Sequence, residues 1–245
     1  MIELKQIHKQ YGKNLAVKEL NLTVFRGELF GFIGPNGAGK TTTIRMIGGL
    51  LAPTAGSVFI DGIDMAREPS RAKKRIGLIP DRPFLYEKLT GMEYMRFVAD
   101  LYGVARDRVH SRAARLLEMF RLLHRAHELI ESYSHGMKQR LVMASALLHE
   151  PPVLIVDEPM VGLDPEGIKM VRDLFRKLAS NGTTVFMSTH TLSLAEDICD
   201  RIGIIHNGSL IATGGIAELR TAARVEGQGL ESAFLALTSE EGRGS

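Results

Sequence analysis

The chemistry of this chain begins with the segment from Gly34 to Thr41, Gly-Pro-Asn-Gly-Ala-Gly-Lys-Thr. It fits the pattern G-x-x-x-x-G-K-[ST], in which glycines let several backbone N–H groups approach a polyphosphate closely. Lys40 adds a positive charge for the β- and γ-phosphates, and the Thr41 hydroxyl is a ligand for Mg²⁺. The residues expected to contact the nucleotide phosphates are Gly34, Pro35, Asn36, Gly37, Ala38, Gly39, Lys40, Thr41 and Thr42.

Two adjacent acids form a second candidate centre. Asp157 and Glu158 follow the apolar run 153–156, which indicates a buried strand that delivers both carboxylates to the ligand-binding edge of a parallel sheet. One acid can reach Mg²⁺ while the other faces a water beside the γ-phosphate. A solvated strand end is the alternative interpretation, and it is weaker in a chain that also contains a phosphate-binding loop.

Four further residues could take part in the chemistry, but each gives weak evidence when taken alone. Ser134 and Gly136 open a predicted helix whose free N–H groups favour an anion, although an ordinary capped helix shows the same pattern. His190 follows the predicted strand 184–188, where its ring can donate to a phosphate oxygen or be merely structural. Tyr11 lies at a turn, where it can stack on an adenine base or pack in the core.

Composition limits the possible classes of protein. The 245 residues include 31 basic and 28 acidic ones interspersed along the chain, so the net charge of +3 gives little reason to expect nucleic-acid binding. The single cysteine, Cys199, excludes an intrachain disulfide and is expected to be a small buried residue. Met1–Lys5 lacks the apolar region of a signal peptide, and no run approaches the roughly 18 apolar residues of a membrane span.

The elements around these residues follow from residue patterns. Period-two segments in 1–28 predict a small antiparallel sheet with a turn at 11–14, and a helical stretch at 89–150 predicts an inserted helical region. Within it the methionines are expected to fill the core, and Phe97 is grouped with Met92, Met95 and Val98. The other expected elements are strands at 29–33, 57–60, 75–79 and 184–188, helices at 41–50 and from Asp164, a hairpin at 207–208, a last helix from Gly229, and frayed residues at 240–245.

With these motifs in order, the chain resembles the ATP-binding subunit of an ABC transporter over roughly residues 2–215. Residues 34–41 are similar to the Walker A motif, 153–158 to Walker B, 133–139 to the signature motif and 162–164 to the D-loop. His190 resembles the switch histidine and Tyr11 the adenine-stacking aromatic. The resemblance implies an α/β fold, the ABC ATPase fold: a P-loop NTPase core with an antiparallel β subdomain and an inserted α-helical subdomain. Its expected parts are 1–80 (β subdomain and P-loop core), 81–150 (helical), 151–215 (α/β core) and 216–245 (helical tail), all within one domain.

The resemblance also implies a mechanism. Each ATP in a head-to-tail homodimer or heterodimer would lie between one subunit's P-loop and the other's Ser134 and Gly136. Glu158 would act on the attacking water, Lys40 and His190 on the γ-phosphate, and Thr41 and Asp157 on Mg²⁺. A separate membrane permease would be the partner, holding the chain at the cytoplasmic face of the cell membrane. Residues near Phe84, Leu85 and Tyr86 are candidates for that contact, with core packing as the alternative.

Two departures from the family pattern matter. The signature segment reads Tyr-Ser-His-Gly-Met in place of Leu-Ser-Gly-Gly-Gln but keeps Ser134 and Gly136. Asp81 stands where the family presents a glutamine that helps to hold Mg²⁺ and water; its carboxylate can ligate Mg²⁺ or turn towards a partner. Similar variants occur in family members that serve exporters, which favours export.

Three other hypotheses compete with this one. A soluble ABC ATPase acting on DNA or ribosomes would carry paired cassettes, a long coiled coil or a basic arm, and none is visible in the sequence. A P-loop kinase acting alone would have no use for a signature helix. A degenerate site that binds ATP without hydrolysing it is disfavoured because Lys40, Asp157, Glu158 and His190 are all present.

Overall fold

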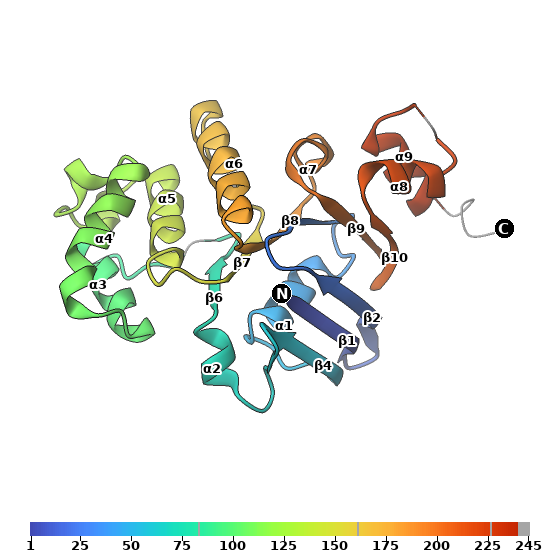
Figure 1. The fold of residues 1–245 in the computed structure, drawn as a ribbon, viewed down its shortest axis with the longest axis horizontal. Helices are drawn as coiled ribbons and strands as arrows, with labels where there is room; N and C mark the ends of the chain where they lie inside the picture. The colour runs from blue at the N-terminus through green and yellow to red at the C-terminus, as the bar shows by residue number, and fades with distance from the viewer. Residues whose placement is uncertain (83, 161, 226, 240–245) are drawn as a thin grey trace.

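The computed structural model describes residues 1–82, 84–160, 162–225 and 227–239, which form two sheets flanked by helices (Figure 1). Within these residues, no helix is both long and apolar enough to cross a membrane. The first sheet has the strand order β2-β1-β4-β5 and is antiparallel throughout. Its strands are β1 (Ile2–Tyr11), β2 (Asn14–Val24), β4 (Ala55–Ile60) and β5 (Ile63–Asp64).

The second sheet has the order β10-β9-β3-β8-β7-β6 and is parallel except for its edge strand β10. Its strands are β3 (Leu29–Ile33), β6 (Ile76–Ile79), β7 (Val153–Asp157), β8 (Thr184–Thr189), β9 (Arg201–His206) and β10 (Ser209–Gly214). Strands β3, β7 and β8 are buried along their whole length, as expected for a parallel sheet covered on both faces. Because β8 lies between β3 and β7, the carboxyl ends of these three strands meet at one edge.

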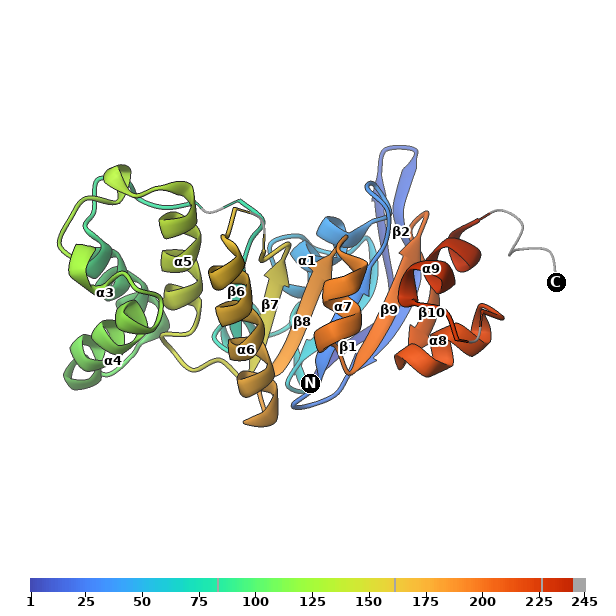
Figure 2. The same cartoon turned by 90° about the horizontal axis from the view of Figure 1, so that it is seen from above.

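Alternate side chains of the parallel sheet point to its two faces and pack in two separate hydrophobic cores. Phe30 and Phe32 face α1 (Lys40–Ile47) and the antiparallel sheet, and each ring centroid lies within 6 Å of that of Phe186. Leu29 and Ile33 face the opposite core, which includes α6 (Pro165–Ser180) and α7 (Leu192–Ile198). The view from above shows α1 on one side of the sheet and α6 and α7 on the other (Figure 2).

The helical region packs beside the edge strand β6 and stands apart from the antiparallel sheet (Figure 1). It contains α3 (Gly91–Tyr102), α4 (Arg106–Met119), α5 (His135–Ala146) and two single 3₁₀ turns, Leu123–Arg125 and Ile130–Ser132. Thr90 and Glu93 form a reciprocal capping box at the start of α3. Met92 and Met95 are buried, as expected for methionines that fill the core, but Met119 is 43% exposed and the expectation was wrong there. Phe97 lies in α3 with Met92, Met95 and Val98, as the helical pattern predicted, although its side chain is exposed.

Several boundaries differ from the sequence prediction. Helix α1 covers 40–47 instead of 41–50, because Gly48 and Gly49 follow it and Gly49 has the left-handed φ of 67° that ends helices. The short helices α2 (Pro69–Lys73) and α7 were not predicted from the sequence. The tail forms α8 (Ile216–Ala222) and α9 (Leu230–Thr238), the latter beginning after Gly229 as expected. Cys199 is buried, as predicted. The expectation for 240–245 falls outside the described residues.

Candidate active site

The P-loop leaves the buried strand β3 and turns into α1 through Gly39, whose φ is 109°. The Lys40 ammonium lies along this loop and donates hydrogen bonds to the carbonyl oxygens of Gly34 at 2.6 Å and Pro35 at 3.1 Å. Burial lowers the pKa of Lys40, while the nearby charges of Glu158 and Asp157 act in the opposite direction. Among the described residues this buried cation donates to carbonyl oxygens, and it is poised to exchange them for the oxygens of an anion.

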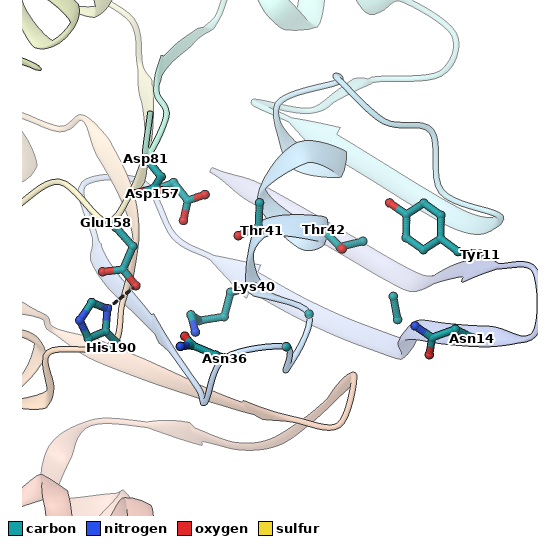
Figure 3. A pocket seen from close by; sticks show the side chains of 13 residues that line it. Tyr11, Asn14, Asn36, Lys40, Thr41, Thr42, Asp81, Asp157, Glu158 and His190 are labelled. Carbon is teal, nitrogen blue, oxygen red and sulfur yellow. Dashed lines mark ion pairs between the residues drawn. The ribbon is translucent and has the colours of Figure 1, made fainter. Parts of the chain in front are cut away.

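The two acids stand at the carboxyl end of β7 and differ in setting. Asp157 is buried and accepts a hydrogen bond from the Ser188 hydroxyl on the neighbouring strand β8. Burial raises the pKa of Asp157, and the charges of Asp81 and Glu158 raise it further. Glu158 has a φ of 50°, in the left-handed region that non-glycine residues rarely occupy, and its N–H donates to the Ser188 carbonyl at 3.2 Å. Figure 3 shows the Glu158 carboxylate pointing towards His190, away from the carboxylate of Asp157.

His190 approaches Glu158 from the end of β8. Its Nδ1 lies 2.9 Å from Glu158 Oε1, and Figure 3 shows this pair on one side of the pocket with Lys40 nearby. The Glu158 side chain is 16% exposed and that of His190 is 61% exposed. The carboxylate is therefore sheltered while the ring remains accessible from solvent.

These groups line a cavity of about 500 Å³ that runs from His190 to Tyr11. Of the residues predicted from sequence, the lining contains Tyr11, Asn36, Gly37, Gly39, Lys40, Thr41, Thr42, Asp81, Asp157, Glu158 and His190. The lining also includes Asn14 and Ala16, which sequence reasoning missed. The turn at 11–14 could have identified Asn14, because a two-residue hairpin loop places residue 14 opposite residue 11.

Five predicted residues are not among the described residues that line this cavity. Gly34, Pro35 and Ala38 belong to the P-loop itself, and a Cβ on Gly34 would stand 2.3 Å from the Ile205 carbonyl oxygen. The requirement for glycine there therefore comes from close packing of the loop on β9. Ser134 precedes α5 as its N-cap and Gly136 lies in its first turn, in the helical region.

The start of α5 is nonetheless well organised. The Ser134 hydroxyl accepts from the Met137 N–H at 3.3 Å, which confirms Ser134 as the N-cap. A Cβ on Gly136 would lie 3.2 Å from the Gly162 carbonyl, so this helix end packs against the loop that follows Glu158. A second potential anion site thus lies outside the P-loop cavity.

The oxygen atoms near the P-loop suit a hard cation. Thr41 and Asp157 offer hydroxyl and carboxylate oxygens in the same cavity, with Asp81 beside them. No cluster of three or more His, Cys, Asp or Glu side chains that could hold a metal occurs in the described part of the chain. This donor set fits Mg²⁺, which takes one or two protein ligands and fills its remaining positions with phosphate oxygens and water.

Comparisons with known proteins place this geometry in a family. The model of the ABC transporter family matches residues 17–161. The chain belongs to this family. It is 39% identical, over 96% of its length and 78% of the relative's, to the linearmycin resistance ATP-binding protein LnrL of Bacillus subtilis (strain 168).

Solved structures agree with that assignment and with the ABC ATPase fold. An ATP-binding subunit of an ABC transporter superposes with a TM-score of 0.93 at 36% identity, covering 98% of this chain and all of the other. A dimeric post-hydrolysis ATP-binding cassette bound to ADP and Pi superposes with a TM-score of 0.81 at 29% identity, covering 88% and 98%. The chain is the ATP-binding subunit of an ABC transporter and an ATPase.

Proposed function

We propose that this subunit hydrolyses Mg·ATP as one half of a head-to-tail dimer and drives export through a separate membrane permease. The observation that supports the proposal is that the chain has two potential anion sites, which lie apart from each other. The cavity unites the P-loop, both acids and His190, whereas the α5 N-terminus with Ser134 and Gly136 is outside it. A second copy turned head to tail would bring its α5 N-terminus to the open side of the cavity.

The P-loop groups would bind the nucleotide. Lys40 would release the two loop carbonyls and pair with the β- and γ-phosphates, since a charge-assisted bond to phosphate is stronger than one to a neutral oxygen. Thr41 and Asp157 would hold Mg²⁺, which would neutralise the phosphate charge. Asp81 would add a third oxygen on the same side, in place of the family's glutamine.

Glu158 and His190 would act on the water and the γ-phosphate. The water oxygen would attack the γ-phosphorus as the bond to the β-phosphate oxygen of ADP breaks, and Glu158 would accept the water's proton. His190 Nδ1, 2.9 Å from Glu158 Oε1, would donate to that carboxylate and hold it in position, and in the imidazolium form of the ring Nε2 would also donate to a γ-phosphate oxygen. In the dimer, the Ser134 hydroxyl and the N–H groups of α5 would close over the same phosphate.

The surface proposed to contact the permease is a cluster of exposed aromatic side chains that follows Asp81 in the sequence. Phe84 is 80% exposed and its ring centroid lies 6.1 Å from that of Tyr86, which in turn lies 5.3 Å from that of Phe97. Leu85 is buried and belongs to the core, so of the three predicted contact residues only its two neighbours remain candidates. This surface would meet the permease at the cytoplasmic face of the membrane, and the similarity to a resistance protein favours outward transport.

The dimer is tested by complementation between two inactive variants. Lys40→Ala disables a chain's own P-loop, and Ser134→Arg blocks the nucleotide held by its partner. In a mixture, a heterodimer retains one complete site, formed by the P-loop of the Ser134→Arg chain and the α5 N-terminus of the Lys40→Ala chain. We expect ATP hydrolysis to reappear on mixing, although each variant alone has none.

Glu158→Gln provides the matched control for the chemistry. This variant should form a stable ATP-dependent dimer in size-exclusion chromatography yet lose nearly all turnover, because a carboxamide cannot accept the proton. Near-normal hydrolysis by Glu158→Gln would remove Glu158 from its proposed role. A mixture of the other two variants that stays as inactive as its parents would contradict the head-to-tail arrangement.

A further inference from the structure

The end of the cavity farthest from Glu158 is built by a pair of residues on facing strands. Tyr11 closes β1 and Asn14 opens β2, and their Cα atoms are register partners in the hairpin. Opposite residues of an antiparallel pair lie on the same face, with Cβ atoms roughly 5 Å apart. Both residues line the cavity, and Figure 3 shows them together at this end.

One face of the Tyr11 ring is already covered. The Lys9 ammonium lies 5.4 Å from the ring centroid and also donates to the Ala52 carbonyl oxygen at 2.8 Å, which holds the cation in place. Tyr11 is nevertheless 47% exposed and lines the cavity, so its ring has surface left for a flat ligand. A nucleobase stacked there would lie beside the Asn14 carboxamide.

The positions of Ala16 and Asn14 on β2 indicate how a nucleotide would be oriented in the cavity. The Ala16 carbonyl oxygen lies 2.6 Å from the point where a Cβ on Gly39 would stand, so Ala16 borders the P-loop. Asn14 precedes Ala16 by two residues on β2 and therefore lies roughly 7 Å farther from the P-loop. With phosphates on the P-loop, the sugar would therefore lie near Ala16, and the edge of a purine farthest from the sugar would lie near Asn14.

The Asn14 carboxamide is free to bind that edge. The side chain is exposed and, among the described residues, makes no hydrogen bond with another group. It offers one donor and one acceptor, which exchange places when the amide group rotates. Adenine presents a donor (the 6-amino group) next to an acceptor (N1) on this edge, and guanine presents an acceptor (O6) next to a donor (N1–H).

We infer that Asn14 contacts the far edge of the purine base and, because its amide can rotate, accepts adenine and guanine alike. This inference rests on the proposed function only in that the nucleotide occupies the P-loop cavity. Asn14 is then the residue whose replacement would create base selectivity, while Tyr11 supplies stacking that every base can use.

The test converts the amide into a group that cannot rotate to suit both bases. In Asn14→Asp the carboxylate only accepts, and guanine offers it two adjacent donors, N1–H and the 2-amino group, where adenine offers one. We expect the ratio of kcat/KM for GTP to that for ATP to rise about fivefold or more. ITP, which lacks the 2-amino group, should gain less than GTP.

Lys13→Gln is the matched control. It changes the net charge by the same single unit, on a neighbouring exposed residue that does not line the cavity among the described residues. A GTP-to-ATP ratio in Asn14→Asp equal to those of wild type and Lys13→Gln would overturn the inference. A wild-type chain that hydrolyses no nucleotide would instead refute the proposed function, so the two failures are distinguishable.

Discussion

Acidification should destabilise this protein through one histidine at the joint between the helical region and the parallel sheet. His149 stacks on the Tyr102 ring with a centroid distance of 3.7 Å, and its Nε2 lies 3.0 Å from the Ile76 carbonyl oxygen at the start of β6. A carbonyl only accepts, so Nε2 carries the proton and Nδ1 is the bare nitrogen. Nδ1 is buried without a hydrogen-bond partner in the described part of the chain.

Protonating Nδ1 would place a charge in this apolar setting. Burial lowers the pKa of His149 from 6.5 to about 4; the hydrogen bond to Ile76 opposes the shift and the charge of Arg112 adds to it. The unfolded chain therefore binds the proton first as the pH falls. The stability contributed by the neutral ring is complete above pH 6.5 and is lost as the pH falls towards 4. Between pH 7 and pH 5 the loss is about 2 kcal/mol.

The assay is urea unfolding of wild type and His149→Gln at pH 7 and pH 5. Glutamine does not titrate, and its amide can still donate to the Ile76 carbonyl. Wild type should lose about 2 kcal/mol more than His149→Gln over this interval, since other groups titrate alike in both. His110→Gln, at an exposed position on α4, should behave as wild type. Equal pH-dependent losses in wild type and His149→Gln would refute the reasoning.

Two further predictions follow from the site and the aromatic surface. Gly34→Ala should greatly weaken ATP binding in calorimetry, because its Cβ would meet the Ile205 carbonyl at 2.3 Å and displace the P-loop from β9; wild-type affinity would show that the loop is not held there. Joint replacement of Phe84 and Tyr86 by Ala should abolish copurification of a multi-span membrane protein while leaving basal ATP hydrolysis intact. Leu101→Ala, at another exposed apolar position, should not do so, and unchanged recovery by the double variant would place the partner elsewhere.

Local patterns predicted much of this protein. The apolar runs 29–33 and 153–156 became the buried strands β3 and β7, and Ser134 and Asp164 became N-caps, each accepting a hydrogen bond from the backbone N–H three residues on. These features depend on residues within a few positions of one another. The same reasoning failed at the short helices α2 and α7 and at Met119, where tertiary packing decides the outcome.

The sequence by itself determined which groups are available: a P-loop, two acids after a buried strand, a histidine after another, and a capped helix N-terminus. Only the tertiary structure decided which of them meet. The order β3-β8-β7 joins the P-loop to Glu158 and His190, which are distant in the chain, and leaves Ser134 on a separate helix. Strand order depends on the packing of both sheet faces, and that is settled by contacts between residues far apart in sequence, which no local pattern contains.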